Sequence, residues 1–268
     1  MNAIVYLTFN SKNDIARNFN ALINGVTKES KLVVIDNNSC DGSAGLLEKG
    51  GWNVHRNHVN TGYTKGINKG LDLAIEFDPE WVFIINPDVM LSEGWDKITD
   101  DLPSCENCGI ITCRLVNSYG NVVHSGGVLS KKRKPILFPC FYDVKDFSVL
   151  GYDLISWSRF VHRDIDCFRE EKVAWGTFAF VALKAEMVKE LGKLDEQFFL
   201  YCSDLEYCLR ARLAGWSILY RPMTFVHSVS SSVRNADDAI KAKIVEDYQK
   251  FARLEEEKWE TLPAVGSL

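Results

Sequence analysis

The chain has 268 residues, of which 46% are hydrophobic and 25% are charged, and its formal net charge is -5. These values are ordinary for a globular protein and argue against a generally basic nucleic-acid-binding protein. No apolar stretch approaches the ~20 residues that a membrane-spanning helix needs, and the opening segment Ala3–Leu7 is expected to be a strand and not a signal peptide. We therefore expect a cytoplasmic protein, either freely soluble or peripheral at a membrane.

The first half of the chain alternates strand and helix patterns joined by short connections. Its predicted strands are Ala3–Thr8, Leu32–Ile35, Trp52–His55 and Trp81–Ile85, and its predicted helices are Asp14–Val26, Ser43–Leu47 and Gly66–Phe77. The longer helices place apolar residues three and four positions apart, whereas the strands are short apolar runs. Alternating strands and helices with right-handed crossovers predict an α/β fold, with a mostly parallel sheet flanked by helices.

This alternation ends near Gly109. The elements expected beyond it are strands at Gly109–Leu115 and Ser217–Tyr220, an edge segment at Val122–Leu129, and helices at Lys184–Leu191 and Asp204–Ala214. Ser130–Lys172 is expected to be irregular, and a connection of this length in a compact domain usually has a function. The segment from Asn235 to Trp259 has an amphipathic helical pattern, and its acidic residues 255–257 favour docking on the protein over docking on anionic lipid.

The eight cysteines include one CxxC motif, formed by Cys105 and Cys108. A zinc ribbon needs a second pair of cysteines at a matching spacing, and the sequence has none. We therefore expect reduced thiols, as is usual in a chain of this length that has no secretion signal.

Polar residues follow two of the predicted strands directly. Asn86-Pro87-Asp88 comes after Trp81–Ile85, which places the Asp88 carboxylate at the sheet edge where α/β folds bind ligands. A carboxylate there suits a Mg²⁺ or Mn²⁺ ion that holds phosphates, although the same tripeptide is also ordinary turn chemistry. Asp36 follows Leu32–Ile35, where it is placed either to bind a ribose or nucleobase or to form an Asx turn.

Five further residues carry candidate chemistry. Gly62 and Gly66 stand at the start of a predicted helix, where close backbone approach and the helix N-terminus favour a diphosphate. Asp204 begins another predicted helix and is either a general base or a helix cap. His227 follows a strand and is either structural or part of a metal site. Asp195 is either functional or a residue that shapes a turn.

Taken in this order, these segments resemble glycosyltransferase family 2, in particular its soluble rhamnosyltransferase-like members with the GT-A fold. The resemblance runs from about Ile4 to about Ser232. Its landmarks are Thr8-Phe9-Asn10, Asp36–Ser39, Asn60-x-Gly62…Gly66-x-Asn68-x-Gly70, Asn86-Pro87-Asp88, Trp175–Phe178, Leu194–Phe199 with Asp204 and Arg210, Gly215-Trp216, and His227.

The resemblance implies one GT-A-like catalytic domain over residues 1–232, with a donor-nucleotide half at 1–115, an acceptor and catalytic half at 116–232, and a helical tail at 233–268. It also implies inverting, metal-dependent transfer of one sugar from a nucleoside-diphosphate sugar to a hydroxyl acceptor. That acceptor would be a glycan, a lipid-linked sugar or a hydroxylated base in nucleic acid. By resemblance, Asp88 and His227 hold Mn²⁺ or Mg²⁺, and Asp204 is the catalytic base.

The donor-binding residues implied by the resemblance lie at strand ends and helix starts. They are Thr8, Asn10, Asp36, Asn38, Asn60, Gly62, Gly66, Asn68, Asn86, Trp175 and Gly176, with Asp195 and Arg210 as further active-site residues. The acceptor is expected to contact Ser130–Lys172, which combines the basic run 131–134 with aromatic residues and so suits a phosphate-bearing molecule. The same segment is also consistent with a solvated basic loop over core aromatic residues.

The chain departs from the family pattern at two positions. Asn86 replaces the first acidic residue of the metal-binding DxD motif, and Ser203 stands where an acidic residue usually precedes the catalytic aspartate. The Gln-x-x-Arg-Trp motif of processive synthases is absent, which favours transfer of a single sugar. The alternatives are a non-catalytic module with this fold and a sugar-phosphate nucleotidyltransferase, although a nucleotidyltransferase would need a basic, glycine-rich loop that Thr8–Ser11 lacks.

Overall fold

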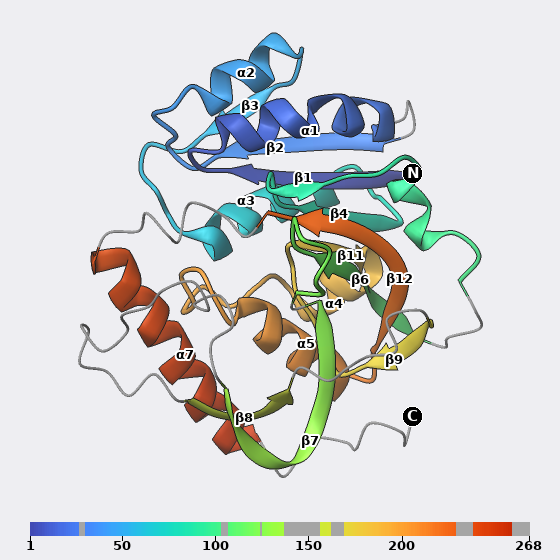
Figure 1. Ribbon diagram of the computed structural model, residues 1–268, viewed down its shortest axis with the longest axis vertical. Coiled ribbons are helices and arrows are strands. Elements are labelled where there is room, and N and C mark those ends of the chain that lie inside the picture. Colours follow the sequence, from blue (N-terminus) through green and yellow to red (C-terminus); the bar gives the residue numbers. More distant parts are fainter. Residues whose placement is uncertain are drawn as a thin grey trace.

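The computed structural model describes residues 1–26, 30–102, 107–123, 125–136, 156–161, 169–228 and 238–258. Its described part is built around one large mixed sheet with helices on both faces, and a smaller sheet lies to one side (Figure 1). This architecture confirms the α/β fold class predicted from the sequence.

The N-terminal half of the large sheet is parallel and has the order β3-β2-β1-β4. Its strands are β1 (Asn2–Thr8), β2 (Ser30–Asp36), β3 (Val54–Arg56) and β4 (Trp81–Ile85). Thr8 pairs with Asp36 at the carboxyl ends of β1 and β2. Because these strands run in the same direction, the polar residues that follow them gather at one edge of the sheet.

The other half of the large sheet mixes strand directions. In it, β11 lies antiparallel between β4 and β6, β12 runs parallel to β6, and β9 and β5 pair antiparallel with β12. The smaller sheet is antiparallel, in the order β10-β7-β8. The bounds of these strands are β5 (Val89–Met90), β6 (Cys108–Val116), β7 (Gly126–Ile136), β8 (Ser156–Val161), β9 (Glu171–Val173), β10 (Trp175–Gly176), β11 (Phe180–Lys184) and β12 (Ser217–His227).

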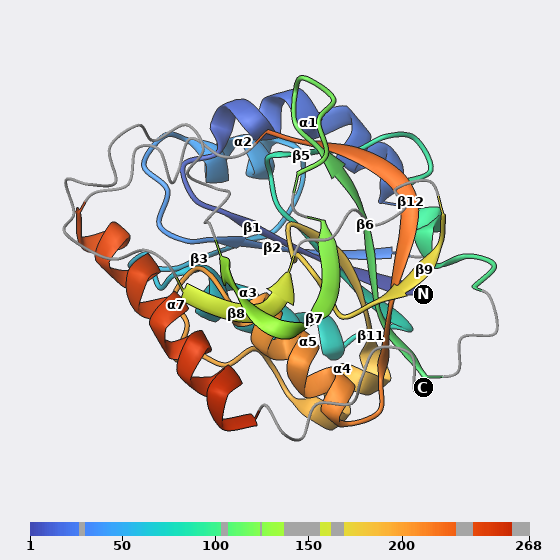
Figure 2. The same ribbon diagram turned by 60° about the horizontal axis from the view of Figure 1, so that its bottom comes forward.

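Helices cover both faces of the large sheet (Figures 1 and 2). On one face lie α1 and α2, on the other lie α3, α4 and α5, and α7 runs along the outside of the molecule. The bounds are α1 (Lys12–Gly25), α2 (Ser43–Lys49), α3 (Tyr63–Ile75), α4 (Ala185–Leu191), α5 (Ser203–Leu213) and α7 (Asp238–Lys258), with a 3-10 helix, η1, at Trp95–Thr99.

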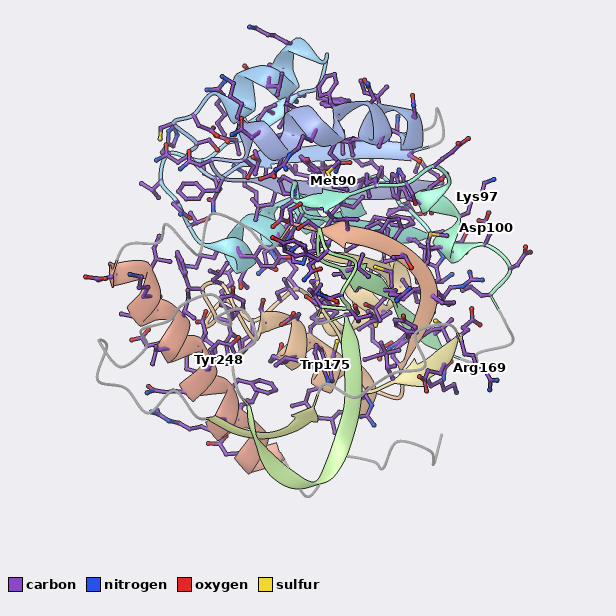
Figure 3. All side chains as sticks on the ribbon, viewed as in Figure 1. Met90, Lys97, Asp100, Arg169, Trp175 and Tyr248 are labelled. Atoms are coloured by element: carbon purple, nitrogen blue, oxygen red, sulfur yellow. The ribbon has the colours of Figure 1, made fainter. Side chains whose placement is uncertain are left out.

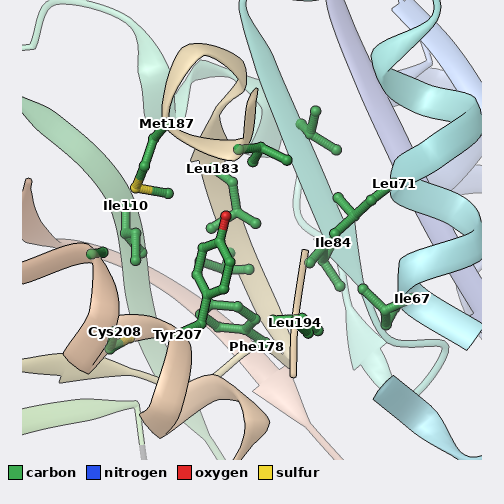
Figure 4. Close-up of a cluster of buried hydrophobic side chains, with 14 of the residues drawn as sticks. Ile67, Leu71, Ile84, Ile110, Phe178, Leu183, Met187, Leu194, Tyr207 and Cys208 are labelled. Atoms are coloured by element: carbon green, nitrogen blue, oxygen red, sulfur yellow. The ribbon is translucent and has the colours of Figure 1, made fainter. Parts of the chain in front are cut away.

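The alternation of side chains along β1 divides the core into two layers. Ala3, Val5 and Leu7 are buried toward α3, α4 and α5, whereas Ile4 and Tyr6 are buried toward α1 and α2. Successive strand residues point to opposite faces, so a strand that is covered on both sides is apolar throughout. Figure 4 shows the first layer, in which side chains of α3, the sheet, α4 and α5 interlock.

Two glycines let α3 lie close against β1. A Cβ atom at Gly66 would stand 2.6 Å from the nearest atom of Leu7, and one at Gly70 would stand 2.3 Å from Val5. Both distances are below any normal carbon–carbon contact. Gly66 therefore serves helix–sheet packing, a role that the sequence interpretation, which assigned it to the diphosphate, did not include.

Most of the predicted elements are found within one to three residues of their expected bounds, including every predicted helix. The sequence did not predict β11, although this strand occupies the centre of the sheet. The expectation that Ser130–Lys172 is irregular is wrong in its described parts, because β8, the end of β7 and the start of β9 lie within it. The rest of that segment, with Phe138, Phe141 and Tyr142, and the side chains of the basic run 131–134, of Trp157 and of Phe160 lie outside the described residues.

Helix α7 docks on the body of the protein, as its amphipathic pattern predicts. Ile244 and Phe251 on its inner face are almost fully buried, and Tyr248 stacks on Tyr201 with ring centroids 5.6 Å apart. Across the described part of the chain, none of the helices combines the length and apolar character that crossing a bilayer requires.

No disulfide bond joins the cysteines that the structure describes, which are Cys40, Cys108, Cys113, Cys202 and Cys208. Cys105, Cys140 and Cys167 lie outside the described residues.

Candidate active site

Asp88 lies in the turn between β4 and β5 and is buried. The short strand β5 pairs with the end of β12, so that His227 lies opposite Val89. This pairing brings His227 Nε2 to 3.3 Å from Asp88 Oδ2. The Ser228 amide also donates to the Asp88 carbonyl at 2.9 Å. Two side chains that are distant in sequence are therefore held together by backbone pairing.

Asn18 of α1 supports this turn from the face of the sheet that α1 and α2 cover. Its side-chain oxygen accepts the Leu91 amide at 3.0 Å, and its side-chain nitrogen donates to the Val89 carbonyl. Because Asn18 is itself buried, both bonds are shielded from water. The segment that follows Asp88 is thus fixed to the first helix.

The Asp88–His227 pair suits a divalent cation. A carboxylate oxygen and an imidazole nitrogen are both ligands that Mn²⁺ accepts, and the carboxylate also suits Mg²⁺. Among the residues that the structure describes, no three His, Cys, Asp or Glu side chains converge as a metal cage. The pair therefore fits an ion that takes its remaining ligands from phosphate oxygens and water, as Mg²⁺ commonly does in nucleotide sites.

Asp204 lies near the start of α5. Its carboxylate accepts the Leu205 amide at 2.9 Å, and it also accepts hydrogen bonds from the Phe178 backbone and the Thr177 side chain. Burial raises the pKa of Asp204 to about 6, and these hydrogen bonds to the charged form limit the rise. A carboxylate with a pKa just below neutrality is well matched to general-base catalysis.

Tyr63, the first residue of α3, joins these two parts of the site. Its hydroxyl donates to the Phe178 carbonyl at 2.7 Å. Burial is the largest cause that raises the pKa of Tyr63 well above its usual value, and the negative charges of Asp204 and Asp88 raise it further. Both carboxylates therefore lie within electrostatic range of the Tyr63 phenol.

Two buried polar atoms at the neighbouring strand ends lack partners within the described protein. They are Thr8 Oγ1 and Asp36 Oδ1, on residues that pair across β1 and β2. The other carboxylate oxygen of Asp36 accepts the Ser39 amide at 3.1 Å, so an Asx-type turn engages only half of this group. Buried polar atoms are normally hydrogen-bonded, and these two are therefore available to a polar ligand.

Residues 3–99 match the family model described as Glycosyl transferase family 2. The chain is 26% identical over 221 residues to the low-salt glycan biosynthesis hexosyltransferase Agl10 of Haloferax volcanii, an alignment that covers 78% of this chain. It is also 22% identical over 247 residues to the N-acetylglucosaminyl-diphospho-decaprenol L-rhamnosyltransferase of Mycobacterium tuberculosis, covering 87% of this chain and 78% of that protein. The match over residues 3–99 and the similarity to these transferases support an assignment to glycosyltransferase family 2. It spans 61% of the length of Agl10.

The fold is that of GT-A glycosyltransferases. The mannosyltransferase PcManGT from Pyrobaculum calidifontis, solved in complex with GDP-Man and Mn²⁺, superimposes with a TM-score of 0.56 at 15% identity, covering 94% of this chain and 70% of that chain. The family 2 model ends at residue 99, so it includes Asp36 and Asp88, whereas Asp204 and His227 lie beyond it.

Several residues that the resemblance to family 2 assigned to donor binding form hydrogen bonds with neighbouring loops. Asn10 accepts the Cys40 amide at 2.9 Å and so ties the end of β1 to the loop after β2, where Asn38 is exposed. Asn60 accepts the Gly62 amide at 2.9 Å. Asn68 is buried and exchanges hydrogen bonds with the backbone of Leu194 at 2.8 and 3.0 Å. These contacts are structural, and direct contact of these side chains with a donor stays a prediction.

The remaining predicted residues fall into two groups. Asn86 lies two residues before Asp88, and Trp175 and Gly176 form β10 beside β7, with the buried Nε1 of Trp175 (labelled in Figure 3) unpartnered among the described residues. By contrast, the guanidinium of Arg210 is engaged by Glu206 and by the carbonyls of Leu191 and Lys193. Asp195 accepts from Gln197 in an adjacent turn.

Sequence reasoning missed three residues that shape this site. Asn37 is buried against the loop 57–62, where its side-chain amide hydrogen-bonds with Asn57, Asn60, Thr61 and Gly62. Tyr63 and Asp247 were also overlooked. Each residue left a signal in the sequence. Asn37 lies inside the polar cluster that follows a strand, Tyr63 is an aromatic residue at a helix start preceded by glycine, and Asp247 is an acidic residue inside the apolar stripe of a helix.

Proposed function

We propose that this protein is an inverting, metal-dependent glycosyltransferase that moves one sugar from a nucleoside-diphosphate sugar to a hydroxyl acceptor. The observation that carries the proposal is that the Asp88–His227 pair follows β4 at the edge where Thr8 and Asp36 leave unpartnered polar atoms, while Asp88 and Asp204 both act electrostatically on Tyr63. The sugars named in its relatives' descriptions, a hexose and L-rhamnose, make these the first donors to test.

In this proposal Thr8 and Asp36 bind the nucleoside, while Asp88 and His227 hold a Mn²⁺ or Mg²⁺ ion. When bound, that ion stabilises the negative charge of the departing diphosphate. Asp204 removes the proton of the acceptor hydroxyl as its oxygen attacks the anomeric carbon. Because Asp204 is one carboxylate acting as a base, the reaction is a single displacement, and a single displacement inverts the anomeric centre.

The test is hydrolysis of nucleotide sugars in the absence of an acceptor. The panel contains UDP-glucose, UDP-N-acetylglucosamine, GDP-mannose and dTDP-L-rhamnose, each assayed with Mn²⁺, with Mg²⁺ and with excess EDTA. We expect release of a nucleoside diphosphate from at least one donor, only when metal is present, and a sugar product with inverted anomeric configuration by NMR. Pyrophosphate release from a nucleoside triphosphate and a sugar 1-phosphate would instead identify a nucleotidyltransferase. Donor binding without any turnover would identify a binding module.

A further inference from the structure

The loop that immediately precedes α5 is fixed by one carboxylate of α7. The amides of Phe199, Leu200 and Tyr201 all donate to Asp247, at 2.8, 2.7 and 3.0 Å. Asp247 is completely buried. Hydrogen bonds to an ionised acceptor are shorter and stronger than neutral ones, so three of them on successive residues define the path of the backbone there.

Other residues of α7 hold the same loop. Lys250 Nζ donates to the Gln197 carbonyl at 2.9 Å, and Lys243 Nζ lies 4.2 Å from the ring centroid of Phe199. Tyr248, labelled on α7 in Figure 3, stacks on Tyr201. These contacts come from residues 243–250, so the middle part of α7 holds this loop at several points.

The opposite side of the loop rests on the start of α3. A Cβ atom at Gly62 would lie 2.5 Å from the ring of Phe199, and the Thr64 amide donates to the Phe199 carbonyl at 3.4 Å. Between these two residues stands Tyr63, which lies near both Asp88 and Asp204. Beyond Tyr201, the chain continues directly into α5 and Asp204. The loop is thus clamped between α7 and the residues that form the candidate site.

We propose that Asp247 is a positioning residue, which acts through the loop 199–201 to hold Asp204 and Tyr63 in register with the Asp88–His227 pair. Helix α7 would then help to position the catalytic residues, although it lies far beyond residues 3–99, which match the family model. The expected effect on kcat rests on the proposed function. The hydrogen bonds between Asp247 and the amides 199–201 are present in the fold whatever the function is.

The test compares Asp247→Asn with Asp238→Asn, the same substitution at an exposed position in the first turn of α7. An asparagine side chain presents one acceptor and one donor, so it cannot accept all three amides. Hydrogen exchange measures protection of the amides 199–201. Kinetics use whichever nucleotide sugar of the panel above the unmodified protein hydrolyses.

We expect Asp247→Asn to lose amide protection at 199–201 and to lower kcat at least tenfold, with donor KM changed less than about threefold, because small misplacements of catalytic groups are costly. Asp238→Asn should leave both readouts unchanged. A variant with lowered thermal stability but unchanged kcat, assayed well below its melting temperature, would show that Asp247 has only a structural role and would overturn the proposal.

A second pair of variants covers the case in which Asp247→Asn does not fold. Lys250→Met removes the bond to the Gln197 carbonyl without leaving a buried charge, and Lys241→Met is its control on the same helix. We expect kcat to fall several-fold in Lys250→Met only, and equal kcat in the two variants would overturn the proposal. If the unmodified protein hydrolyses no donor, the proposed function fails, whereas hydrogen exchange still tests the clamp.

Discussion

At the scale of single residues, the ionised form of the candidate base Asp204 destabilises the folded protein. Burial raises the pKa of Asp204 to about 6, whereas an aspartate in an unfolded chain has a pKa near 3.9. Between these two values the folded protein binds the proton more tightly than the unfolded chain does. The free energy of unfolding therefore falls as the pH rises from about 4 to about 6, and above that range the charged carboxylate destabilises the fold.

This linkage predicts that Asp204→Asn stabilises the protein at pH 7.5, by about 1–3 kcal/mol from the size of the shift. The gain should disappear below about pH 4, where the native carboxyl group is also neutral. Urea denaturation of both proteins at several pH values measures it, with the exposed Asp101→Asn as the control. If the Asp204→Asn variant is instead less stable than the native protein at pH 7.5, Asp204 is a structural cap.

At the scale of elements, the close packing of α3 on β1 places the start of α3 beside the strand ends. The nearest contact is that of Gly70, where an added Cβ would lie 2.3 Å from Cγ1 of the fully buried Val5. Valine has few alternative rotamers, so the clash must be relieved by a shift of the helix. Such a shift would move Tyr63 as well as the apolar face of α3.

We expect Gly70→Ala to lower the free energy of unfolding by about 1–3 kcal/mol, as overpacked core substitutions do. Gly45→Ala in α2 provides the matched control, because an added Cβ there meets nothing within 4 Å. In that open helical position alanine should raise stability by about 0.5–1 kcal/mol. Chemical denaturation measures both, and a stabilised Gly70→Ala protein would contradict the packing described for α3.

The elements that the sequence predicted are those with a strong local pattern. The helix at α1 and the strands β1, β2 and β4 show their periodicity or apolar run without reference to the rest of the chain. By contrast, β11 is antiparallel to both its neighbours, and its run Phe180–Leu183 leads directly into a helix, so its place in the sheet depends on tertiary packing. The two-residue strand β5 is too short for any pattern, although it brings His227 to Asp88.

The same distinction applies to the site. Asp36 and Asp88 follow recognisable strands, so their place at one sheet edge could be predicted from the sequence. The contact of Asp247 with the amides 199–201 joins a tail helix to a distant loop, and no local pattern carries that information. The motif position of Arg210 predicted an active-site role, but it could not reveal that the side chain binds the carbonyls of Leu191 and Lys193.

At the scale of the whole molecule, the candidate site is assembled from separate parts of the chain. The parallel half of the sheet contributes Thr8, Asp36 and Asp88, the end of β12 contributes His227, and α5 contributes Asp204. Helix α7 holds the loop that leads to α5. We propose that this assembly separates two tasks, with metal-assisted donor binding at Asp88 and proton removal at Asp204.

The most direct measurement of that claim compares donor affinity and turnover in Asp88→Asn and Asp204→Asn. Calorimetric titration with the nucleotide sugar that the unmodified protein hydrolyses gives the affinity, in Mn²⁺ and in EDTA, and transfer or hydrolysis gives kcat. We expect Asp204→Asn to bind donor normally while its kcat falls by ~10²–10⁴-fold, and Asp88→Asn to lose the Mn²⁺-dependent part of donor affinity. Near-normal turnover in Asp204→Asn, or unchanged Mn²⁺-dependent binding in Asp88→Asn, would contradict this separation of roles.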